Sequence, residues 1–288
     1  MDQINLKAYA KINLGLDIAG KREDGYHLLK TVFQTIDIHD NVNVRKTESG
    51  IILKTNKPYI PTDEKNIAYK AALKIISKYN LKAGVRIDIG KNIPVGGGMA
   101  GGSTDGAAVI LAMNKLFNLN MSLTEMDEIA VGLGADVPFC LRKGTYLAEG
   151  IGEKLKKLND IPDADILIFH PAFSVSTKWA YEKADAIKNP KHPQMDKVLD
   201  AIEKSDLKEI SKYIENSFEE IVGEIHPEIF EIKKIMEDEG ALKALMTGSG
   251  SSIFGIFESK EKAEKASLKL KQDYGNKNAY ITKTVKGN

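Results

Sequence analysis

The sequence predicts a protein that contains both β-strands and α-helices, and three observations support this expectation. Apolar and polar residues alternate over residues 6–16, which is the period of a strand with one buried face. Apolar residues recur at helical spacing over residues 66–79. In the second half of the chain, a long charged region of helical character, residues 195–240, lies between short apolar segments that are typical of strands.

The remaining elements are predicted from the strand period, from helical spacing and from residues typical of helix ends. A capping box, Ser122-Leu-Thr-Glu125, marks the start of one helix, and Gly134 marks its end. A helix rich in Lys and Glu precedes the last strand. The expected strands are residues 6–16, 31–38, 41–46, 85–89, 164–169, 253–257 and 279–285. The expected helices are residues 66–79, 107–117, 122–133 and those within 195–240.

A polar stretch that contains a proline, residues 154–163, is typical of a domain boundary. The chain has 288 residues, which is enough for one large domain or two modest ones. We therefore expect two domains, residues 1–157 and residues 158–288.

The composition excludes several classes of protein. Hydrophobic residues make up 42% and charged residues 28%, and the net charge of +1 gives no reason to expect a nucleic-acid partner. The sequence contains no run of 18 apolar residues and no signal-peptide h-region, so we expect a cytoplasmic protein without membrane association. The one cysteine, Cys140, cannot form an internal disulfide, and the five histidines lack zinc-binding spacing, so we expect no structural metal. Nothing in the sequence implies an obligate protein partner.

Residues 94–104, Pro-Val-Gly-Gly-Gly-Met-Ala-Gly-Gly-Ser-Thr, form a glycine-rich loop between an expected strand and an expected helix. Five glycines fall within the seven residues from Gly96 to Gly102, and glycine permits positive φ and close approach of a ligand. The helix that follows has unpaired N–H groups and a partial positive charge at its start. Together these features predict an anion site suited to phosphates, with Ser103 and Thr104 as hydroxyl donors.

Other phosphate-binding loops fit these residues less well. A Walker A loop requires a lysine that this loop lacks. The dinucleotide fingerprint matches at Gly96, Gly98 and Gly101, but a capping box and another helix follow where a second strand with an acidic end is required. The VAIK, HRD and DFG motifs of protein kinases are absent from the sequence. A flexible loop without a ligand remains the alternative, although five glycines at such a junction destabilise the fold unless they are used.

Residues 94–104 closely resemble the ATP-binding motif of the superfamily of galactokinase, homoserine kinase, mevalonate kinase and phosphomevalonate kinase (GHMP). The strand Ala10-Lys-Ile-Asn-Leu14 is similar to the first motif of this superfamily, and Thr247-Gly-Ser-Gly-Ser-Ser252 is similar to the third. The three motifs occur in the right order and span nearly the whole chain. The resemblance implies a two-lobed α+β fold with the active site in the cleft between the lobes. It also implies ATP binding by the N-terminal domain and substrate binding by the C-terminal α+β domain.

Within this superfamily the chain is most similar to the kinases of a CDP-linked methylerythritol. The resemblance rests on Ala10–Leu14, on Arg22-Glu-Asp-Gly-Tyr-His27 and on Leu133-Gly-Ala-Asp-Val-Pro138. It implies a small-molecule CDP-linked substrate, with ATP as the phosphoryl donor, in the non-mevalonate route to isoprenoids. Another GHMP kinase, such as a homoserine or mevalonate kinase, is the first alternative. A non-catalytic nucleotide-binding regulator is the second, although such a protein has no need of both Lys11 and Asp136.

The resemblance also assigns the nucleotide site. Asn66, which opens a helix, is expected near the adenine pocket. The chemistry implies Mg²⁺, because a divalent ion bridges the phosphates, but no compact carboxylate cluster in the sequence marks its ligands. The loop residues expected to contact ATP are Pro94, Val95, Gly96, Gly97, Gly98, Met99, Ala100, Gly101, Gly102, Ser103 and Thr104.

Lys11 and Asp136 are the expected catalytic residues. Asp136 follows a helix end in a loop bounded by Gly and Pro, where its side chain can accept the proton of the attacking hydroxyl as the P–O bond forms. Lys11 can keep Asp136 ionised and stabilise charge on the attacking oxygen. The resemblance implies the same pair. The alternative is that Lys11 is solvated on its strand and that Asp136 only ends a helix.

Asn13 lies two residues from Lys11 and therefore on the same strand face, so we expect it to help place the substrate or the γ-phosphate. A hydrogen bond within a turn is the alternative role for Asn13. Tyr26 and His27 are expected to meet the cytosine, because an aromatic ring stacks on a base and imidazole can bond a pyrimidine edge. An ordinary aromatic pair in a hairpin is the alternative.

Two further substrate contacts follow from the resemblance. Tyr181 is expected as a second aromatic ring against the base, with core packing as the alternative. Gly248, Ser249 and Gly250 are expected to form a turn near the substrate diphosphate, although glycine–serine runs also make plain turns.

Overall fold

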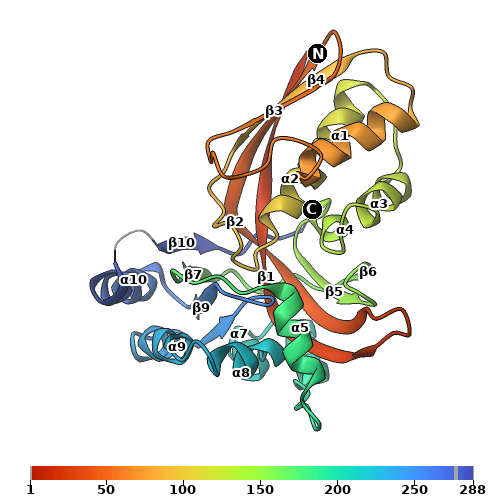
Figure 1. Ribbon diagram of the computed structural model, residues 1–288. Coiled ribbons are helices and arrows are strands. Elements are labelled where there is room, and N and C mark those ends of the chain that lie inside the picture. Colours follow the sequence, from red (N-terminus) through yellow and green to blue (C-terminus); the bar gives the residue numbers. More distant parts are fainter. Residues whose placement is uncertain (1, 276–277, 288) are drawn as a thin grey trace. The chain divides into compact units, whose positions relative to one another are not determined.

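The structure is a computed structural model that describes residues 2–275 and 278–287, and it confirms the expected α+β class (Figure 1). Its internal contacts divide the chain into two compact units. The first unit comprises Met1–Ala10, Ile38–Pro94 and Ala100–Arg142, and the second comprises Lys11–Asp37, Val95–Met99 and Lys143–Asn288. The units are therefore made of interleaved segments, whereas the sequence analysis expected one boundary after residue 157. The assignment of ATP binding and substrate binding to residues 1–157 and 158–288 therefore stays a prediction.

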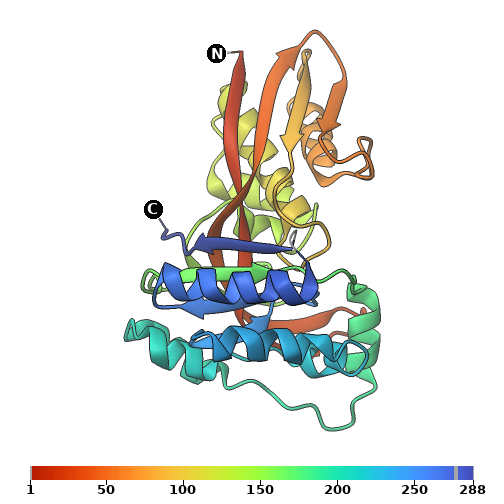
Figure 2. The same ribbon diagram turned by 90° about the vertical axis from the view of Figure 1, so that its left-hand side faces the viewer.

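Two long strands contribute to both units. They are β1 (Gln3–Lys21) and β2 (His27–Thr47), which pair with each other. In the first unit, residues 41–47 of β2 pair antiparallel with β4 (Gly84–Gly90), and β4 pairs parallel with β3 (Ile51–Thr55). Helices cover one side of these strands (Figures 1 and 2). The helices are α1 (Ile67–Lys78), α2 (Gly101–Leu116), α3 (Leu123–Val131) and α4 (Val137–Cys140).

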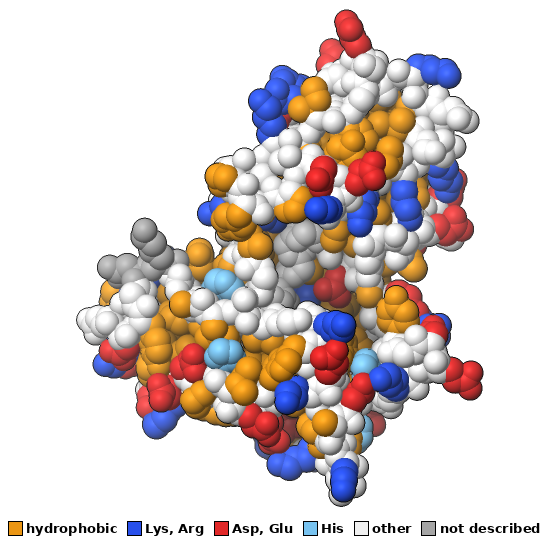
Figure 3. All heavy atoms as spheres, viewed as in Figure 1, with side chains coloured by type: hydrophobic (Ala, Val, Ile, Leu, Met, Phe, Trp, Pro, Cys, Tyr) orange, Lys and Arg blue, Asp and Glu red, His pale blue; other side chains and the backbone are white. Residues whose placement is uncertain are grey.

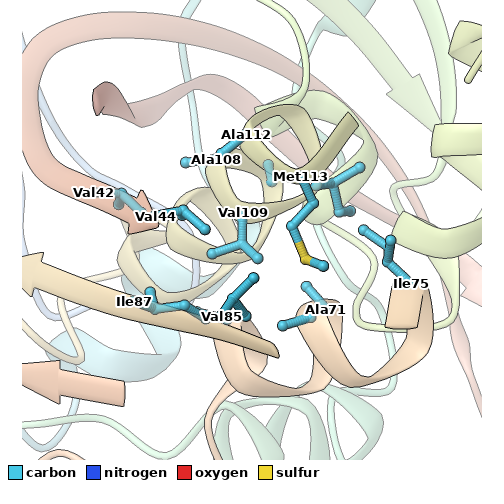
Figure 4. Close-up of a cluster of buried hydrophobic side chains, with 14 of the residues drawn as sticks. Val42, Val44, Ala71, Ile75, Val85, Ile87, Ala108, Val109, Ala112 and Met113 are labelled. Atoms are coloured by element: carbon cyan, nitrogen blue, oxygen red, sulfur yellow. The ribbon is translucent and has the colours of Figure 1, made fainter. Parts of the chain in front are cut away.

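The core of the first unit forms where the apolar face of the strands meets α1 and α2 (Figure 4). Val44 and Ile87 project from β2 and β4 toward Val109 of α2, and all three side chains are buried. Burial of each such side chain stabilises the fold by about 1.5–3 kcal/mol. The alternation in 85–89 that predicted a strand thus has the expected cause, which is a buried face against helices.

The second unit contains an antiparallel sheet in the order β10-β7-β9-β8. Its strands are β7 (Asp165–Phe169), β8 (Lys243–Met246), β9 (Ile253–Phe257) and β10 (Ala279–Lys283). A layer that includes α9 (Glu228–Asp238) and α10 (Lys260–Tyr274) covers one face of this sheet (Figure 2). In the same unit, residues 31–34 of β2 pair with β5 (Thr145–Glu149), which pairs with β6 (Lys154–Lys157).

The helical region expected over residues 195–240 is present and comprises α6 (Met195–Glu203), α7 (Leu207–Tyr213), α8 (Ser217–Gly223) and α9. The polar stretch expected to contain a domain boundary, residues 154–163, begins as β6, because its first residues pair with β5. A helix that the sequence analysis did not predict, α5 (Thr177–Asp185), begins at the N-cap Ser176, whose side chain accepts a hydrogen bond from the Trp179 N–H.

The surface agrees with the balanced composition. On the face drawn in Figure 3, Lys and Arg side chains are interspersed with Asp and Glu side chains. None of the helices in the described ranges combines the length and apolar character that a membrane span requires.

Candidate active site

The glycine-rich loop lies between β4, which ends at Gly90, and α2, which begins at Gly101. Gly96 and Gly98 have φ values of 77° and 74°, and Ala100, the residue before α2, has a φ of 60°. A non-glycine residue in this left-handed region is uncommon, and strained residues of this kind cluster at functional sites. The first turn of the 16-residue helix α2 therefore follows directly after a tight turn, and its N–H groups are suited to an anion.

The helix begins earlier than the sequence predicted. Residues 101–104, expected as part of the loop, form the first turn of α2, whereas the expected start was residue 107. Thr104 is buried, and its hydroxyl donates a hydrogen bond of 2.8 Å to the Tyr9 carbonyl oxygen. The other predicted hydroxyl donor, Ser103, lies on the first turn and is partly exposed. Because the Thr104 hydroxyl is bound inside the protein and Ser103 is partly exposed, Ser103 is the better candidate for a phosphate contact.

Within the second unit, the tip of the loop lies against the third motif. A Cβ atom at Gly97 would overlap the Ser252 hydroxyl, and one at Gly98 would overlap the Thr247 carbonyl oxygen. Ser252 is fully buried and lies 3.0 Å from Nδ1 of His170. Glycine at positions 97 and 98 is therefore required by close packing of the two motifs.

Gly98→Ala is expected to destabilise the protein more than Gly96→Ala. Both residues have positive φ, at which alanine costs about 1–2 kcal/mol. A Cβ atom at Gly96 would meet nothing within 4 Å, whereas one at Gly98 would overlap Thr247. We expect Gly98→Ala to lose about 1–3 kcal/mol more of the free energy of unfolding, measured by chemical denaturation. Equal losses in the two variants would contradict the close approach of the two motifs.

Lys11 and Asn13 project from the same face of β1, as the period of two predicted. Both side chains are buried, and the Lys11 ammonium donates a hydrogen bond of 2.7 Å to Oδ1 of Asn13. The ammonium also lies 5.1 Å from the ring centroid of Phe33, and the Lys11 N–H donates to the Met99 carbonyl oxygen. The alternative that Lys11 is solvated on its strand is therefore wrong.

Asn13 joins the first motif to the third. Its backbone N–H donates to Oγ1 of Thr247 at 3.1 Å, and the same hydroxyl donates to Oδ1 of Asn13 at 3.2 Å. Nδ2 of Asn13 donates to Oγ1 of Thr31 at 2.8 Å. The sequence analysis missed Thr31 and Thr247 as members of this network, although Thr247 stands at the start of the third motif. Within the second unit, β1, residues 95–99 and residues 247–252 thus lie in direct contact.

Asp136 occupies the position before α4 in the first unit. Its side chain does not cap that helix, while its backbone carbonyl accepts a hydrogen bond from the Cys140 N–H. The carboxylate is therefore not committed to the helix end. Lys11 belongs to the second unit, and the predicted Lys11–Asp136 pair stays a prediction.

Tyr26 and His27 follow the turn between β1 and β2, but they have different surroundings. Tyr26 is 59% exposed, whereas the His27 ring stacks on the Tyr181 ring at 4.3 Å between centroids. Nε2 of His27 lies 2.6 Å from Oδ1 of Asp185, a carboxyl whose pKa is lowered by hydrogen bonds from Lys21 and His27. Tyr181 thus supports the His27 ring, and its contact with a base stays a prediction.

A cavity of about 930 Å³ lies beside His27 within the second unit. His27 and Asp185 line one part of it, and Asn216 lines another. Its volume lies in the range of pockets that hold nucleotides and other small ligands.

The third motif forms a tight turn. Gly248 and Gly250 have φ values of 60° and 95°, which are typical of glycine. The hydroxyl of Ser249 lies 2.8 Å from that of Thr177, the first residue of α5. The predicted turn at residues 248–250 is therefore present, and its contact with a diphosphate stays a prediction.

Asn66 is the N-cap of α1, as expected for a residue that opens a helix. Its Oδ1 accepts a hydrogen bond of 2.9 Å from the Ala68 N–H, and its Nδ2 donates to the Pro61 carbonyl oxygen. The oxygen and the nitrogen of the Asn66 amide are thus both bound within the protein. The expected position of Asn66 near adenine stays a prediction.

A buried ion cluster lies beneath the start of α2 in the first unit. The Lys91 ammonium contacts the carboxylates of Asp40 and Asp105 and donates to the Gly101 carbonyl oxygen at 3.2 Å. Asp40 also accepts a hydrogen bond of 2.8 Å from the Ile93 N–H. Burial lowers the pKa of Lys91, but the two carboxylates outweigh this effect and raise it. The cluster connects the segment before the glycine-rich loop with α2, the helix after the loop. The sequence did not predict this cluster.

Asp105→Asn is expected to weaken the pH dependence of stability. Burial raises the pKa of Asp105 from 3.8 to about 7, against the attraction of Lys91. Because the folded state then binds more protons than the unfolded chain between these values, stability falls as pH rises through this range. Asn cannot ionise, so the free energy of unfolding should fall less between about pH 5 and about pH 8 in urea denaturation of this variant.

Asp88→Asn is the matched control for this test. A hydrogen bond from Arg86 lowers the pKa of Asp88, so its contribution is lost only as pH falls below its ordinary value. We expect the control to keep the wild-type slope between about pH 5 and about pH 8. The same slope in Asp105→Asn as in the wild type would contradict the raised pKa.

Comparisons with known proteins define the class of this chain. The model of the GHMP kinases N terminal domain matches residues 66–144, and that of the GHMP kinases C terminal matches residues 198–276. A crystal structure of homoserine kinase from Cytophaga hutchinsonii has a TM-score of 0.80 at 22% identity and covers 100% of this chain and 96% of its own, which shows a shared fold. These findings identify an ATP-dependent kinase of the GHMP superfamily.

Proteins with higher sequence identity to this chain show to which family of the superfamily it belongs. A crystal structure of 4-(cytidine 5'-diphospho)-2C-methyl-D-erythritol kinase has a TM-score of 0.82 at 33% identity, covering 98% of this chain and 99% of that chain. The 4-diphosphocytidyl-2-C-methyl-D-erythritol kinase of Clostridium botulinum (strain Alaska E43 / Type E3) is 46% identical over 282 residues, covering 98% of this chain and 100% of that protein. That of Caldicellulosiruptor bescii is 49% identical over 269 residues, covering 93% and 94%. The chain belongs to the family of 4-diphosphocytidyl-2-C-methyl-D-erythritol kinases.

Proposed function

We propose that the protein transfers the γ-phosphoryl group of ATP to the 2-hydroxyl of 4-diphosphocytidyl-2-C-methyl-D-erythritol. The products are the 2-phosphate and ADP, and the reaction belongs to the non-mevalonate route to isoprenoid precursors. The observation that carries the choice of substrate is His27, which stacks on Tyr181 and lines a cavity of about 930 Å³. The fold alone does not choose the substrate, because a homoserine kinase shares it.

ATP binding is assigned to the glycine-rich loop, residues 94–104, with Asn66 near the adenine. Positive φ at Gly96 and Gly98 gives the tight turn that a phosphate-binding loop requires, and the first turn of α2 adds its N–H groups and dipole. Ser103 is the hydroxyl that we assign to a phosphate contact.

Mg²⁺ bound with ATP would neutralise charge on the phosphates. Across residues 2–275 and 278–287, no group of three His, Cys, Asp or Glu side chains is arranged to hold a metal ion. This chemistry fits an ion held mainly by phosphate oxygens and water, and we assign no protein side chain to it.

Transfer itself is assigned to Lys11 and Asp136. The Asp136 carboxylate accepts the proton of the attacking 2-hydroxyl as the new P–O bond forms. The buried Lys11 ammonium stabilises negative charge on the attacking oxygen, and its hydrogen bond to Asn13 fixes its direction. Asn13, joined to Thr247, then places the substrate alcohol or the γ-phosphate.

Substrate recognition is assigned to the second unit. Tyr26 is exposed and free to stack on cytosine, where an aromatic contact contributes about 1–3 kcal/mol. His27, supported by Tyr181 and Asp185, bonds the pyrimidine edge. The turn formed by Gly248, Ser249 and Gly250 is assigned to the diphosphate, and the Gly250 N–H closes this turn by donating to the Thr247 carbonyl oxygen.

The test is an ADP-release assay with three alcohols, namely the CDP-linked methylerythritol, homoserine and mevalonate. We expect turnover with the first and values of kcat/KM lower by at least about 10³-fold with the others, because their lack of a CDP group leaves the recognition site unfilled. Turnover of homoserine or mevalonate with no turnover of the CDP-linked alcohol would refute the proposal.

A further inference from the structure

The turn of the third motif is closed by two backbone hydrogen bonds, from the Thr247 N–H to the Ser252 carbonyl oxygen and from the Gly250 N–H to the Thr247 carbonyl oxygen. Thr247, the first residue of the turn, bonds with Asn13 through its hydroxyl. The residues on either side of Thr247 are Met246 and Gly248. The carbonyl oxygens of both residues accept a hydrogen bond from the same side chain.

That side chain is Asn216, which no part of the sequence analysis singled out. Its Nδ2 donates to the Met246 carbonyl oxygen at 2.7 Å and to the Gly248 carbonyl oxygen at 2.8 Å. Its Oδ1 accepts a hydrogen bond of 3.0 Å from the Phe218 N–H at the start of α8. Asn216 is 7% exposed, so these bonds are shielded from competition by water.

The backbone on either side of Asn216 is bound to the strand that carries Lys11. Leu16 of β1 forms an isolated parallel bridge with Asn216, and the Leu16 N–H donates a hydrogen bond of 3.0 Å to the Glu215 carbonyl oxygen. The same short segment therefore contacts β1 through its backbone and the third motif through its side chain.

A second side chain from α8 supports the same strand end. Oε2 of Glu219 accepts a hydrogen bond of 2.8 Å from the Met246 N–H, and its other carboxylate oxygen contacts the Lys233 ammonium. The N–H and the carbonyl oxygen of Met246 are thus both bound by side chains at or near the start of α8. These bonds hold the residue from which the turn begins.

We propose that Asn216 is a positioning residue for phosphoryl transfer. Asn216 binds the carbonyl groups of Met246 and Gly248, the two residues that flank Thr247. The Thr247 hydroxyl thereby stays on Asn13, and the turn at Gly248 keeps its geometry. The proposal rests on the proposed function, which assigns Asn13 and this turn to substrate placement. Asn216 acts through these residues, and it also borders the cavity that adjoins His27.

The chemistry of the side chain separates this role from simple helix capping. Asp and Ser are as good as Asn at the N-cap, because each supplies an acceptor oxygen. Neither supplies two N–H donors to two carbonyl oxygens, and Asp directs negative charge at them. Asn216→Asp and Asn216→Ser therefore keep the cap of α8 and remove the bonds to the third motif.

The experiment compares both variants with the wild type and with Asp206→Asn. Asp206 caps α7 by accepting from the Lys208 and Glu209 N–H groups, a role that Asn retains. Two readouts are made on each protein, namely kcat and KM with the CDP-linked alcohol and hydrogen exchange at residues 247–252 and 217–223. The second readout needs no substrate.

For both Asn216 variants we expect kcat/KM to fall by at least about tenfold, since small displacements of positioning groups cost up to about 10²-fold. We expect hydrogen exchange to become faster at residues 247–252, while protection of α8 is retained. Asp206→Asn should match the wild type in both readouts. If the wild type does not phosphorylate the CDP-linked alcohol, the proposed function fails, whereas hydrogen exchange still reports on the contact.

Three outcomes would overturn the inference. The first is unchanged kcat/KM in variants whose residues 247–252 exchange faster. The second is unchanged exchange at these residues. The third is loss of folded protein in both variants, since Asn216 would then serve the fold and not the placement of the turn.

Discussion

Asp136→Asn is expected to lower kcat by at least about 10²-fold while ATP binding is retained, because Asn is nearly isosteric with Asp but cannot accept the proton of the attacking hydroxyl. The side chain of Asp136 does not cap α4, so the substitution removes no capping bond. The expected loss is therefore in kcat, while the affinity for ATP is retained. Steady-state kinetics and equilibrium binding of ATP measure the two effects separately.

Asp206→Asn is the control for Asp136→Asn, since it makes the same chemical change at another position next to a helix start. It should have wild-type kcat. Turnover of Asp136→Asn within a few-fold of the wild type would remove Asp136 from the mechanism.

Lys11→Met is expected to lower kcat by about 10²–10³-fold, the usual effect of removing one group that stabilises charge in the transition state. Met keeps the length and apolar stem of the side chain but lacks the ammonium. Oδ1 of Asn13 still accepts from the Thr247 hydroxyl, so the substitution leaves no unpaired acceptor there. The expected loss is therefore mainly in kcat, as measured by steady-state kinetics.

Lys7→Met is the matched control, because Lys7 is exposed on the same strand. We expect its kcat to equal that of the wild type. A Lys11→Met enzyme with normal kcat, or with a loss no larger than that of Lys7→Met, would contradict the assigned role of the ammonium.

The parts of the site that the sequence predicted are those set by local geometry. The period of a strand placed Lys11 and Asn13 on one face, and the structure confirms this with a hydrogen bond between them. The glycine run predicted positive φ values before a helix, which Gly96 and Gly98 confirm. The capping box at Ser122 and the helix start at Asn66 are likewise confirmed, because each depends on residues no more than a few positions apart.

The parts that the sequence did not predict depend on distant contacts. Thr247 bonds with Asn13 across 234 positions in the chain, and no local period encodes such a pair. Asn216 looks like an ordinary N-cap in the sequence, and only the fold brings its amide to the carbonyl groups of Met246 and Gly248. The buried cluster of Lys91, Asp40 and Asp105 also joins separate segments, so its residues resemble surface charges until they are packed together.

The position of the transferred phosphate tests the central claim most directly. The 2-carbon of the proposed substrate bears a methyl group and no hydrogen, whereas its other free hydroxyl groups are on carbons that bear hydrogen. In a proton-coupled ³¹P NMR spectrum of the product, we expect a new phosphomonoester signal without coupling to a carbon-bound proton. A doublet or triplet would mean transfer to another hydroxyl, and the absence of a new phosphomonoester with ATP present would contradict the proposed function.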